Sequence, residues 1–383
     1  MTLITTTEAL AAFVERMRAE TFVTVDTEFM RDRTYWPKLC LMQIAGAKEA
    51  VAVDPLAPSM DMAPLAALVD DPGVVKVLHA ARQDLEIFFR LFGRLPSPLY
   101  DTQIAAMVCG FGEEVAYETL VNEIAHGRLD KASRFTDWSR RPLSAAQLAY
   151  ALGDVTHLRT IYEALSRRIG AAGRTAWVAE EVASLADPAL YQPDPAESWR
   201  RLKPRSRDRR FLAVVQRLAA WREREAQRRD LPRNRVIRDD VVMEIAATRP
   251  ASVEALRDLD RVSLDRESTR AVIAEIQAAM ALPEHELPRA EVQVRLPRGI
   301  GPLIDLLRVL LKLRAEDSDV AQRLIANGGD LEAIALDDHA DVPALKGWRR
   351  EIFGTEALAL KRGEIGIAVR DRRISVVPLG PPA

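Results

Sequence analysis

Two carboxylates one residue apart, inside an apolar stretch, place the strongest constraint on how this chain can fold. They are Asp26 and Glu28, set among Val, Thr and Phe in residues 22–29. Side chains alternate between the two faces of a strand, so we expect both acids on one face. Like charges at such short range repel, and a hard divalent cation would neutralise them. Two solvated acids at the end of an edge strand would explain this stretch equally well.

Two further acids and a tyrosine lie on elements that a fold could bring to this strand. An apolar run at residues 74–78 leads directly into a helix that carries Asp84. A long helix expected at residues 145–169 carries Tyr150 and Asp154, which share a face because they are four residues apart. In isolation, such a pair is better explained as a surface hydrogen bond. With the first two acids, however, four carboxylates can hold two Mg²⁺ or Mn²⁺ ions, which suits phosphodiester hydrolysis.

The order of the elements in the N-terminal part indicates a mixed sheet. Apolar runs at residues 22–29, 39–45 and 50–53 are joined by short connections, which is typical of an antiparallel meander. The strand at residues 74–78 feeds a helix without a long loop, as in a βα unit. A further acid, Asp101, is interpreted as a helix cap rather than as a fifth metal ligand.

Three segments resemble, in order, the exonuclease motifs of the DEDD superfamily. They are Val-Asp-Thr-Glu-Phe at 25–29, His-Ala-Ala-Arg-Gln-Asp-Leu at 79–85 and Tyr-Ala-Leu-Gly-Asp at 150–154. The third segment has Tyr four residues before Asp, as in the tyrosine subtype of the superfamily. The histidine subtype has His five residues before that Asp, where this chain has Ala149. The whole chain is similar to the bacterial ribonuclease D family, most closely over residues 1–170.

This resemblance implies a role for five residues. Those that match the family's metal ligands are Asp26, Glu28, Asp84 and Asp154. Tyr150 matches the residue that orients the attacking water. The resemblance also implies two divalent cations, Mg²⁺ or Mn²⁺, as cofactors. It further implies an α/β RNase H-like mixed-sheet exonuclease domain that hydrolyses RNA from the 3′ end and releases 5′-mononucleotides.

The C-terminal half is expected to be all-α. Prolines between residues 187 and 195 predict a linker. The helices that follow resemble the HRDC module, which is implicated in RNA binding in this family. A similar pattern near residues 303–315 indicates a second module, with a generic helical extension as the alternative. The expected parts are an exonuclease domain at 1–170, a connection at 171–208, an HRDC-type domain at 209–285, a second HRDC-like domain at 300–370 and a tail at 371–383.

Positive charge is concentrated in one segment, although the net charge of the chain is only −2. Residues 200–235 hold 14 Arg or Lys and 4 Asp or Glu, a balance of +10. Such a density indicates contact with phosphates. The alternative is a solvated helix face on which the charges pair with one another. The small number of acids within the segment favours nucleic-acid contact.

Four other side chains are candidates for contact with the substrate. Tyr35 and Trp36 follow the first acidic strand and could stack on an unpaired 3′ base, or they could simply pack their loop. Arg140 and Arg141 precede the helix that carries Asp154 and could contact phosphates. A solvated loop explains these two arginines equally well.

Composition excludes several classes of protein. With 48% hydrophobic and 29% charged residues, the chain is globular rather than disordered. No run approaches the ~18 consecutive apolar residues of a membrane span, and residues 1–20 do not resemble a signal peptide. We therefore expect a cytoplasmic protein without membrane contact, and a monomer by default. The two cysteines, Cys40 and Cys109, are too few for a disulfide framework.

The resemblance to the ribonuclease D family implies a 3′–5′ exoribonuclease that matures the 3′ ends of stable RNA, such as tRNA precursors with 3′ extensions. A DNA exonuclease with the same acids is one alternative, because the sequence does not display contacts to a 2′-hydroxyl group. An inactive RNA-binding protein on the same scaffold is the other. The presence of all four acids argues against inactivity.

Overall fold

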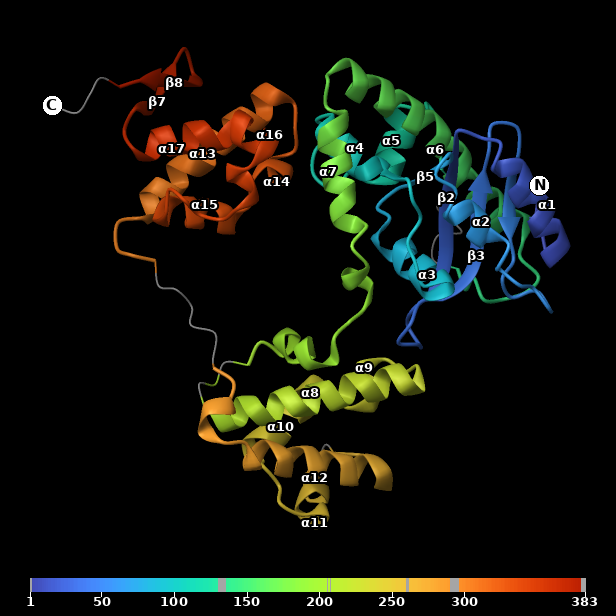
Figure 1. The fold of residues 1–383 in the computed structure, drawn as a ribbon, viewed down its shortest axis with the longest axis vertical. Coiled ribbons are helices and arrows are strands. Elements are labelled where there is room, and N and C mark those ends of the chain that lie inside the picture. Colours follow the sequence, from blue (N-terminus) through green and yellow to red (C-terminus); the bar gives the residue numbers. More distant parts are fainter. Residues whose placement is uncertain are drawn as a thin grey trace.

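The computed structural model describes residues 2–129, 136–204, 206, 208–259, 262–289 and 296–379. A sheet-containing domain forms the N-terminal part, and its last helix is α7 (Thr175–Leu185). From there the chain leads to a helical unit around α8 (Arg209–Arg229), and then to a second helical unit around α13 (Gly301–Ser318) (Figure 1). Within the described ranges, no helix is both long and apolar enough to cross a membrane.

The sheet of the N-terminal domain is mixed, as predicted. Its strands are β1 (Thr2–Ile4), β2 (Phe22–Met30), β3 (Lys38–Ala45), β4 (Ala50–Val53), β5 (Val75–Leu78) and β6 (Leu99–Asp101). Their order is β1-β4-β3-β2-β5-β6. The pairs β2–β3 and β3–β4 are antiparallel, which confirms the expected meander, and the other three pairs are parallel. The strand that carries the first two acids therefore lies inside the sheet, not at its edge.

Helices cover both faces of this sheet. Those that pack with Val23 and Val25 on one face are α1 (Thr7–Met17), α2 (Leu65–Val69) and α3 (Arg82–Phe92). The long helix α6 (Ala145–Ala171) lies over the other face, where the Thr24 hydroxyl donates to the Val155 carbonyl oxygen at 2.7 Å. Since Thr24, Asp26 and Glu28 alternate with the apolar residues of β2, α6 covers the face that carries the acids.

Two shorter helices and a capping box complete the surroundings of α6. The two helices are α4 (Thr102–Val108) and α5 (Tyr117–Glu123), which share a core cluster with Ile161 and Leu165 of α6. The Ser144 hydroxyl accepts from the Gln147 backbone amide, while the Gln147 side chain accepts from the Ser144 amide. This reciprocal cap starts α6 just before Tyr150 and Asp154.

The first helical unit is built on α8, which connects to the exonuclease domain through η2 (Pro188–Tyr191) and η3 (Pro195–Leu202). The other helices are α9 (Arg233–Val236), α10 (Asp239–Thr248), α11 (Val253–Arg257), α12 (Arg266–Ala281) and η4 (Glu284–Glu286). Asp208 caps α8, because its carboxylate accepts from the amides of Arg210 and Phe211. Apolar side chains of α8, α10 and α12 form one core.

The second helical unit repeats the start of the first. The long helix α8 is followed by the C-cap residue Asp230 and α13 by Asp319, and both caps have the left-handed conformation, with φ of 50° and 51°. Each is followed by a four-residue helix, α9 or α14 (Gln322–Ile325), and then by α10 or α15 (Gly328–Leu336). The two series are offset by 89 residues, since Asp230, Arg233 and Asp239 correspond to Asp319, Gln322 and Gly328. The rest of the second unit contains η5 (Pro343–Leu345), α16 (Gly347–Arg349), the π-helical turn η6 (Arg350–Gly354) and α17 (Thr355–Lys361).

The prediction of a tail at residues 371–383 is wrong for its first part. Strand β7 (Ile365–Arg370) pairs with β8 (Arg373–Pro378) in an antiparallel hairpin. Alternation in Ile-Ser-Val-Val places Val376 against the second helical core, together with Ile367. Residues 380–383 lie outside the part of the chain that the structure describes.

Candidate active site

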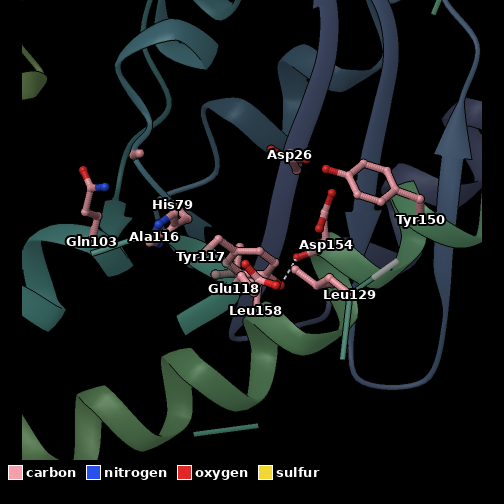
Figure 2. Close-up of a pocket in the computed structure, with 11 residues that line it drawn as sticks. Asp26, His79, Gln103, Ala116, Tyr117, Glu118, Leu129, Tyr150, Asp154 and Leu158 are labelled. Carbon is pink, nitrogen blue, oxygen red and sulfur yellow. Dashed lines mark hydrogen bonds between the residues drawn. The ribbon is translucent and has the colours of Figure 1, made fainter. Parts of the chain in front are cut away.

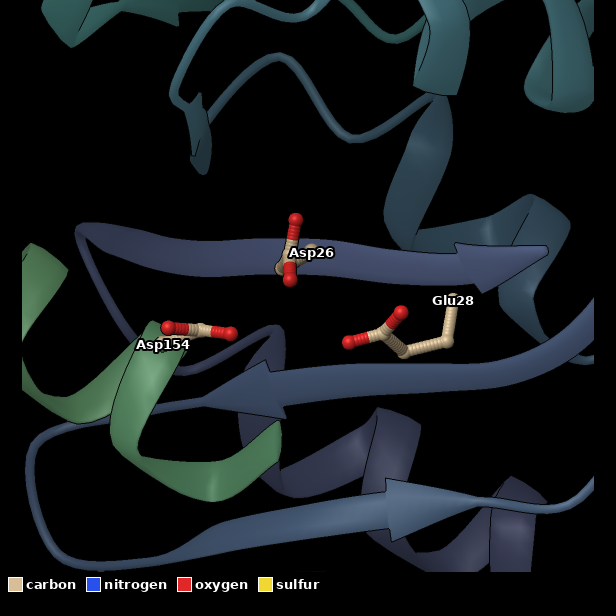
Figure 3. A group of neighbouring side chains, drawn as sticks. All are labelled: Asp26, Glu28 and Asp154. Carbon is tan, nitrogen blue, oxygen red and sulfur yellow. The ribbon is translucent and has the colours of Figure 1, made fainter. Parts of the chain in front are cut away.

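Three of the predicted acids meet between β2 and α6. Asp26 and Glu28 extend from the same face of β2, and Asp154 faces them from α6 (Figure 3). One carboxylate oxygen from each residue lies within 4.8 Å of the other two. The alternation of side chains in the strand therefore brings the first pair together, as expected, and α6 supplies the third acid.

Burial changes the acid–base behaviour of this cluster. Burial is the main cause that raises the pKa of Asp26 from 3.8 to about 6, against a smaller opposing effect of a backbone hydrogen bond. The pKa of Tyr150 is raised by burial and then by the carboxylates of Asp154, Glu28 and Asp26. Tyr150 thus keeps its proton at neutral pH and can donate a hydrogen bond next to the acids.

Asp84 reaches β2 from the opposite layer. It lies in the first turn of α3, which packs on the other face of the sheet, and its carboxylate accepts a hydrogen bond from the Thr27 hydroxyl. Among the described residues, the set of acids within 4.8 Å of one another does not include Asp84. The pKa of Asp84 is nevertheless raised well above its usual value, first by burial and second by the charge of Asp26. The fourth acid, Asp84, therefore lies near enough to the cluster to be affected by the charge of Asp26, while its carboxylate is held by the Thr27 hydroxyl.

Asp101 holds the turn that leads to Asp84. Its carboxylate caps α4 by accepting from the amides of Gln103 and Ile104, as the sequence predicts for a cap. The same carboxylate accepts from the amides of Ala80 and Ala81 at 3.2 and 2.8 Å. Ala80 has a φ of 55°, which is unfavourable for a residue with a Cβ. These two hydrogen bonds help to hold that conformation immediately before α3.

An open cavity of about 320 Å³ adjoins the acid cluster (Figure 2). Asp26, Tyr150 and Asp154 line one side, and His79 and Tyr117 line the other. The Tyr117 hydroxyl donates to the backbone carbonyl of Asp154 at 2.5 Å, and the His79 ring lies 5.4 Å from the Tyr117 ring. Sequence reasoning missed Tyr117, because nothing in its spacing signals a contact with a residue 37 positions away.

Of the two alternatives for Tyr35, stacking on an RNA base or packing within the protein, the structure supports packing. Only 5% of this residue is exposed, and its hydroxyl donates to the carboxylate of Glu223 in α8. The guanidinium group of Arg233 lies over the ring at 4.7 Å. A base has no access to the Tyr35 ring, so this residue packs between the exonuclease domain and the first helical unit. Trp36 is half-buried, with the guanidinium group of Arg90 on its ring at 3.7 Å.

The two arginines before α6 differ. Arg141 forms a bidentate pair with the buried Asp54 and also donates to the backbone carbonyls of Cys40, Trp138 and Arg140. Its guanidinium group is therefore used inside the domain, and the predicted phosphate contact is wrong for Arg141. Arg140 stays accessible, with 84% of its side chain exposed and Asp137 at 3.4 Å.

Most arginines of α8 are paired with acids that lie elsewhere in the sequence. Glu275 of α12 accepts from both Arg217 and Arg224, at 2.9 Å each. Arg222 pairs with Asp239 of α10, whereas Arg233 of α9 pairs with Glu223 inside the segment. The low number of acids within residues 200–235 therefore does not leave most arginines of α8 unpaired, because acids beyond the segment, such as Asp239 and Glu275, also pair with them. Only some of this basic segment remains available to phosphates.

The donor set of the cluster suits a hard divalent cation. Its groups are carboxylates, and neither cysteine contributes, since Cys40 and Cys109 are both buried elsewhere. Mg²⁺ and Mn²⁺ prefer oxygen ligands, whereas soft metals prefer thiolates. Three carboxylates within 4.8 Å of one another, in a partly buried site, also create the field that such a cation would neutralise.

Comparison with known proteins agrees with both parts of the structure. Residues 1–170 match the family model described as 3′-5′ exonuclease, and residues 211–266 match the HRDC domain. The ribonuclease D of Gluconacetobacter diazotrophicus is 52% identical over 379 residues, which are 98% of this chain and 96% of that protein. The ribonuclease D of Acidiphilium cryptum is 52% identical over 380 residues, covering 98% and 97%.

A solved structure extends this agreement to the fold. The crystal structure of Escherichia coli RNase D superposes with a TM-score of 0.80 at 31% identity, and the match covers 94% of this chain and 98% of that one. The family matches in sequence, the mixed sheet and the acid cluster lead to one conclusion. The chain belongs to the ribonuclease D family of 3′–5′ exoribonucleases.

Proposed function

We propose that Asp26, Glu28, Asp84 and Asp154 hold two divalent cations, Mg²⁺ or Mn²⁺, and that these ions serve hydrolysis of the 3′-terminal phosphodiester bond of RNA. The close approach of carboxylates from β2 and α6 carries this proposal. Asp84 joins the set because the charge of Asp26 reaches it, although Thr27 orients its carboxylate. When bound, such a pair of cations stabilises the attacking and leaving oxygens of an in-line displacement.

Tyr150 would orient the attacking water through its hydroxyl group. Its pKa is raised by burial and by the neighbouring acids, so the hydroxyl stays protonated and remains a hydrogen-bond donor. Tyr150 and Asp154 line the same cavity, which gives the terminal nucleotide a place beside them. Tyr117 would act as a positioning residue, because its hydroxyl holds the backbone carbonyl of Asp154 at 2.5 Å.

The substrate proposed for this site is RNA with an unpaired 3′ extension, such as a tRNA precursor, and the products are 5′-mononucleotides. Two observations support an RNA substrate. The chain belongs to the ribonuclease D family, and its solved E. coli relative is described as an exoribonuclease involved in structured RNA processing. Arg140, which is exposed, and Trp36, which is half-buried, are proposed contacts to this RNA.

We also propose that residues 300–370 form a second HRDC-like module. The repeat of a long helix, a left-handed Asp, a four-residue helix and a third helix supports this assignment. The HRDC family model covers only residues 211–266, so the second module rests on the repeat alone.

A time course on matched RNA and DNA tests the proposed activity. Both strands carry the same unpaired 3′ tail and a 5′ label, and each is incubated with Mg²⁺, with Mn²⁺ or with chelator. We expect single-nucleotide shortening of the RNA from its 3′ end, with either metal and not with chelator. Equal shortening of the DNA would instead favour a DNA exonuclease. Tight RNA binding without shortening in either metal would mean that the protein only binds RNA.

A further inference from the structure

Two open hollows lie where the exonuclease domain meets the first helical unit. The first has a volume of about 260 Å³, and the second about 310 Å³. Arg31, Tyr35, Arg201 and Arg233 line both hollows, so the two are continuous. Arg82 lines the first hollow as well. With Arg222 in the second hollow, five arginines from two separate parts of the chain thus face one space.

Two residues of this space lie close in sequence to the acids, on the same two elements. Arg31 follows the end of β2, three residues after Glu28. Arg82 begins α3, two residues before Asp84. The strand and the helix that supply the acids therefore also supply one wall of the hollow. A strand of RNA whose 3′ end lies at the acids would have its preceding nucleotides near this wall.

The arginines of the hollow differ in their partners. Arg31 donates to both carboxylate oxygens of Glu86, at 2.7 and 3.0 Å. Arg233 donates to both oxygens of Glu223. Within the described ranges, neither Arg82 nor Arg201 forms an ion pair or a side-chain hydrogen bond, and both are exposed. Two guanidinium groups, one from each side of the space, are therefore available to a ligand.

The opposite wall is held by a network between the two parts of the molecule. The Tyr35 hydroxyl contacts Glu223, and Arg233 donates to that hydroxyl at 3.0 Å. The carboxylate of Asp230, at the end of α8, accepts from the backbone amides of Tyr35 and Trp36 at 3.1 and 3.0 Å. Figure 1 shows the loop after β2 pointing at this end of α8. These contacts keep the hollow open between two fixed surfaces.

We propose that this hollow binds the phosphate backbone of single-stranded RNA on the 5′ side of the nucleotide being removed, with Arg82 and Arg201 as the contacting residues. The inference rests on the proposed function, in which RNA is the substrate. Guanidinium groups bind phosphate oxygens in a bidentate manner, and the two residues are free to do so. Base stacking is not available here, because the aromatic residues in the lining, Tyr35 and Tyr191, are only 5% and 4% exposed. The site therefore recognises the backbone and not the sequence of the RNA.

The test compares a long and a short substrate in Arg82→Gln, Arg201→Gln and the double variant. The long substrate is a single-stranded RNA of about 12 nucleotides, and the short one is a dinucleotide that cannot extend from the acids into the hollow. Specificity constants are measured for both substrates. Equilibrium binding of the long RNA is measured in chelator as a function of salt. Arg224→Gln is the matched control, because this exposed arginine of α8 is paired with Glu275.

The double variant is expected to lose about five- to twenty-fold in kcat/KM for the long RNA, and much less for the dinucleotide. The slope of log affinity against log salt should fall by about one for each arginine removed. Arg201→Lys should retain that slope, because the charge remains. An equal loss for both substrates, or an unchanged slope in the double variant, would overturn the proposal. If the wild-type protein shortens neither substrate, the proposed function fails instead, and the salt slope in chelator still decides whether the hollow binds RNA.

Discussion

The acid cluster and the basic segment at residues 200–235 both contain many like charges, and the fold treats them in opposite ways. In the first, β2 and α6 bring like charges within 4.8 Å of one another. In the second, α10 and α12 bring acids to several of the arginines, as Glu275 does for Arg217 and Arg224. Bringing like charges together in a buried site is unfavourable unless a ligand neutralises them. The cluster is thus the stronger sign of function.

The basic segment shows why charge density alone is a weak guide. Many of its partners come from residues 239 to 284, beyond the stretch in which the sequence balance of +10 is counted. Exposed ion pairs contribute only about 0.2–1 kcal/mol each to stability, yet they occupy the guanidinium groups that a phosphate would need. Contact with RNA is accordingly assigned to the few arginines that lack such partners.

Apart from the substitution of an acid itself, the largest effect expected at the acid cluster is that of substituting Tyr150. We expect Tyr150→Phe to slow single-turnover hydrolysis of RNA about 100-fold, because the attacking water loses a positioned hydrogen-bond partner. Metal affinity should change less than two-fold. Tyr162→Phe, on the same helix but outside the acid cluster, is the matched control. A Tyr150→Phe enzyme with normal single-turnover rates would remove Tyr150 from the mechanism.

Protons should compete with metal at Asp26. Burial raises the pKa of this carboxyl from 3.8 to about 6 in the metal-free protein. Because cations bind the ionised form, Mn²⁺ affinity should rise up to about ten-fold per pH unit below pH 6 and level off above it. Calorimetric titrations at several pH values between 5 and 8 measure this. Affinity that is constant across the whole range would contradict the assignment.

The same pKa shift has a defined sign for stability. The folded protein holds a proton on Asp26 more tightly than the unfolded chain does, so the metal-free protein should lose stability as pH rises from about 4 to about 6. Asp26→Asn removes this titration. The stability of this variant relative to wild type should therefore increase over that interval, by on the order of 1 kcal/mol per pKa unit, in denaturant titrations with chelator.

Substitution of Glu275 tests whether ion pairing prevents the basic segment from binding RNA phosphates. We expect Glu275→Gln to release Arg217 and Arg224, to tighten RNA binding two- to five-fold at low salt, and to steepen its salt dependence. Glu244→Gln, on α10, removes the same charge outside this ion pair and is the control. Equal effects of the two variants would mean that net charge matters and pairing does not.

The smallest expected effect concerns the contact between the exonuclease domain and the first helical unit. Tyr35→Phe removes the hydroxyl that meets Glu223, Gln227 and Arg233. We expect a loss of about 1–2 kcal/mol in the stability of the docked first helical unit, since Glu223 is 1% exposed and loses a partner. Limited proteolysis of the connection at residues 186–208 would detect the loosening. Unchanged cleavage rates would show that the contacts of Asp230 are enough to hold the first helical unit against the exonuclease domain.

Local patterns explain what the sequence could predict. Alternation in β2 placed Asp26 and Glu28 on one face, and helical spacing put Tyr150 with Asp154; the structure confirms both arrangements. The mixed sheet followed from short connections and one strand that feeds a helix. Asp101 was correctly interpreted as a cap, because Asp before a helix is a strong local signal.

What could not be predicted depends on contacts between distant segments. The burial of Tyr35 requires α8, 188 residues away, and the pairing of Arg141 requires Asp54. The hairpin of β7 and β8 was missed because a short strand after the charged turn at Asp371 and Arg372, close to the end of the sequence, resembles a tail. The function of the hollow depends on which arginines remain unpaired, and only the assembled fold decides that.

The most direct test of the central claim, that the acid cluster performs hydrolysis, is to measure turnover and affinity together in Asp154→Asn. Single-turnover rate with Mg²⁺ and the Kd for the same RNA in chelator are determined for this variant and for Glu163→Gln, an exposed acid on the same helix. We predict at least a 1,000-fold loss of rate in Asp154→Asn, with Kd within about three-fold of wild type, and no change in the control. An Asp154→Asn protein that still hydrolyses RNA at a rate comparable to that of the wild type would contradict the account.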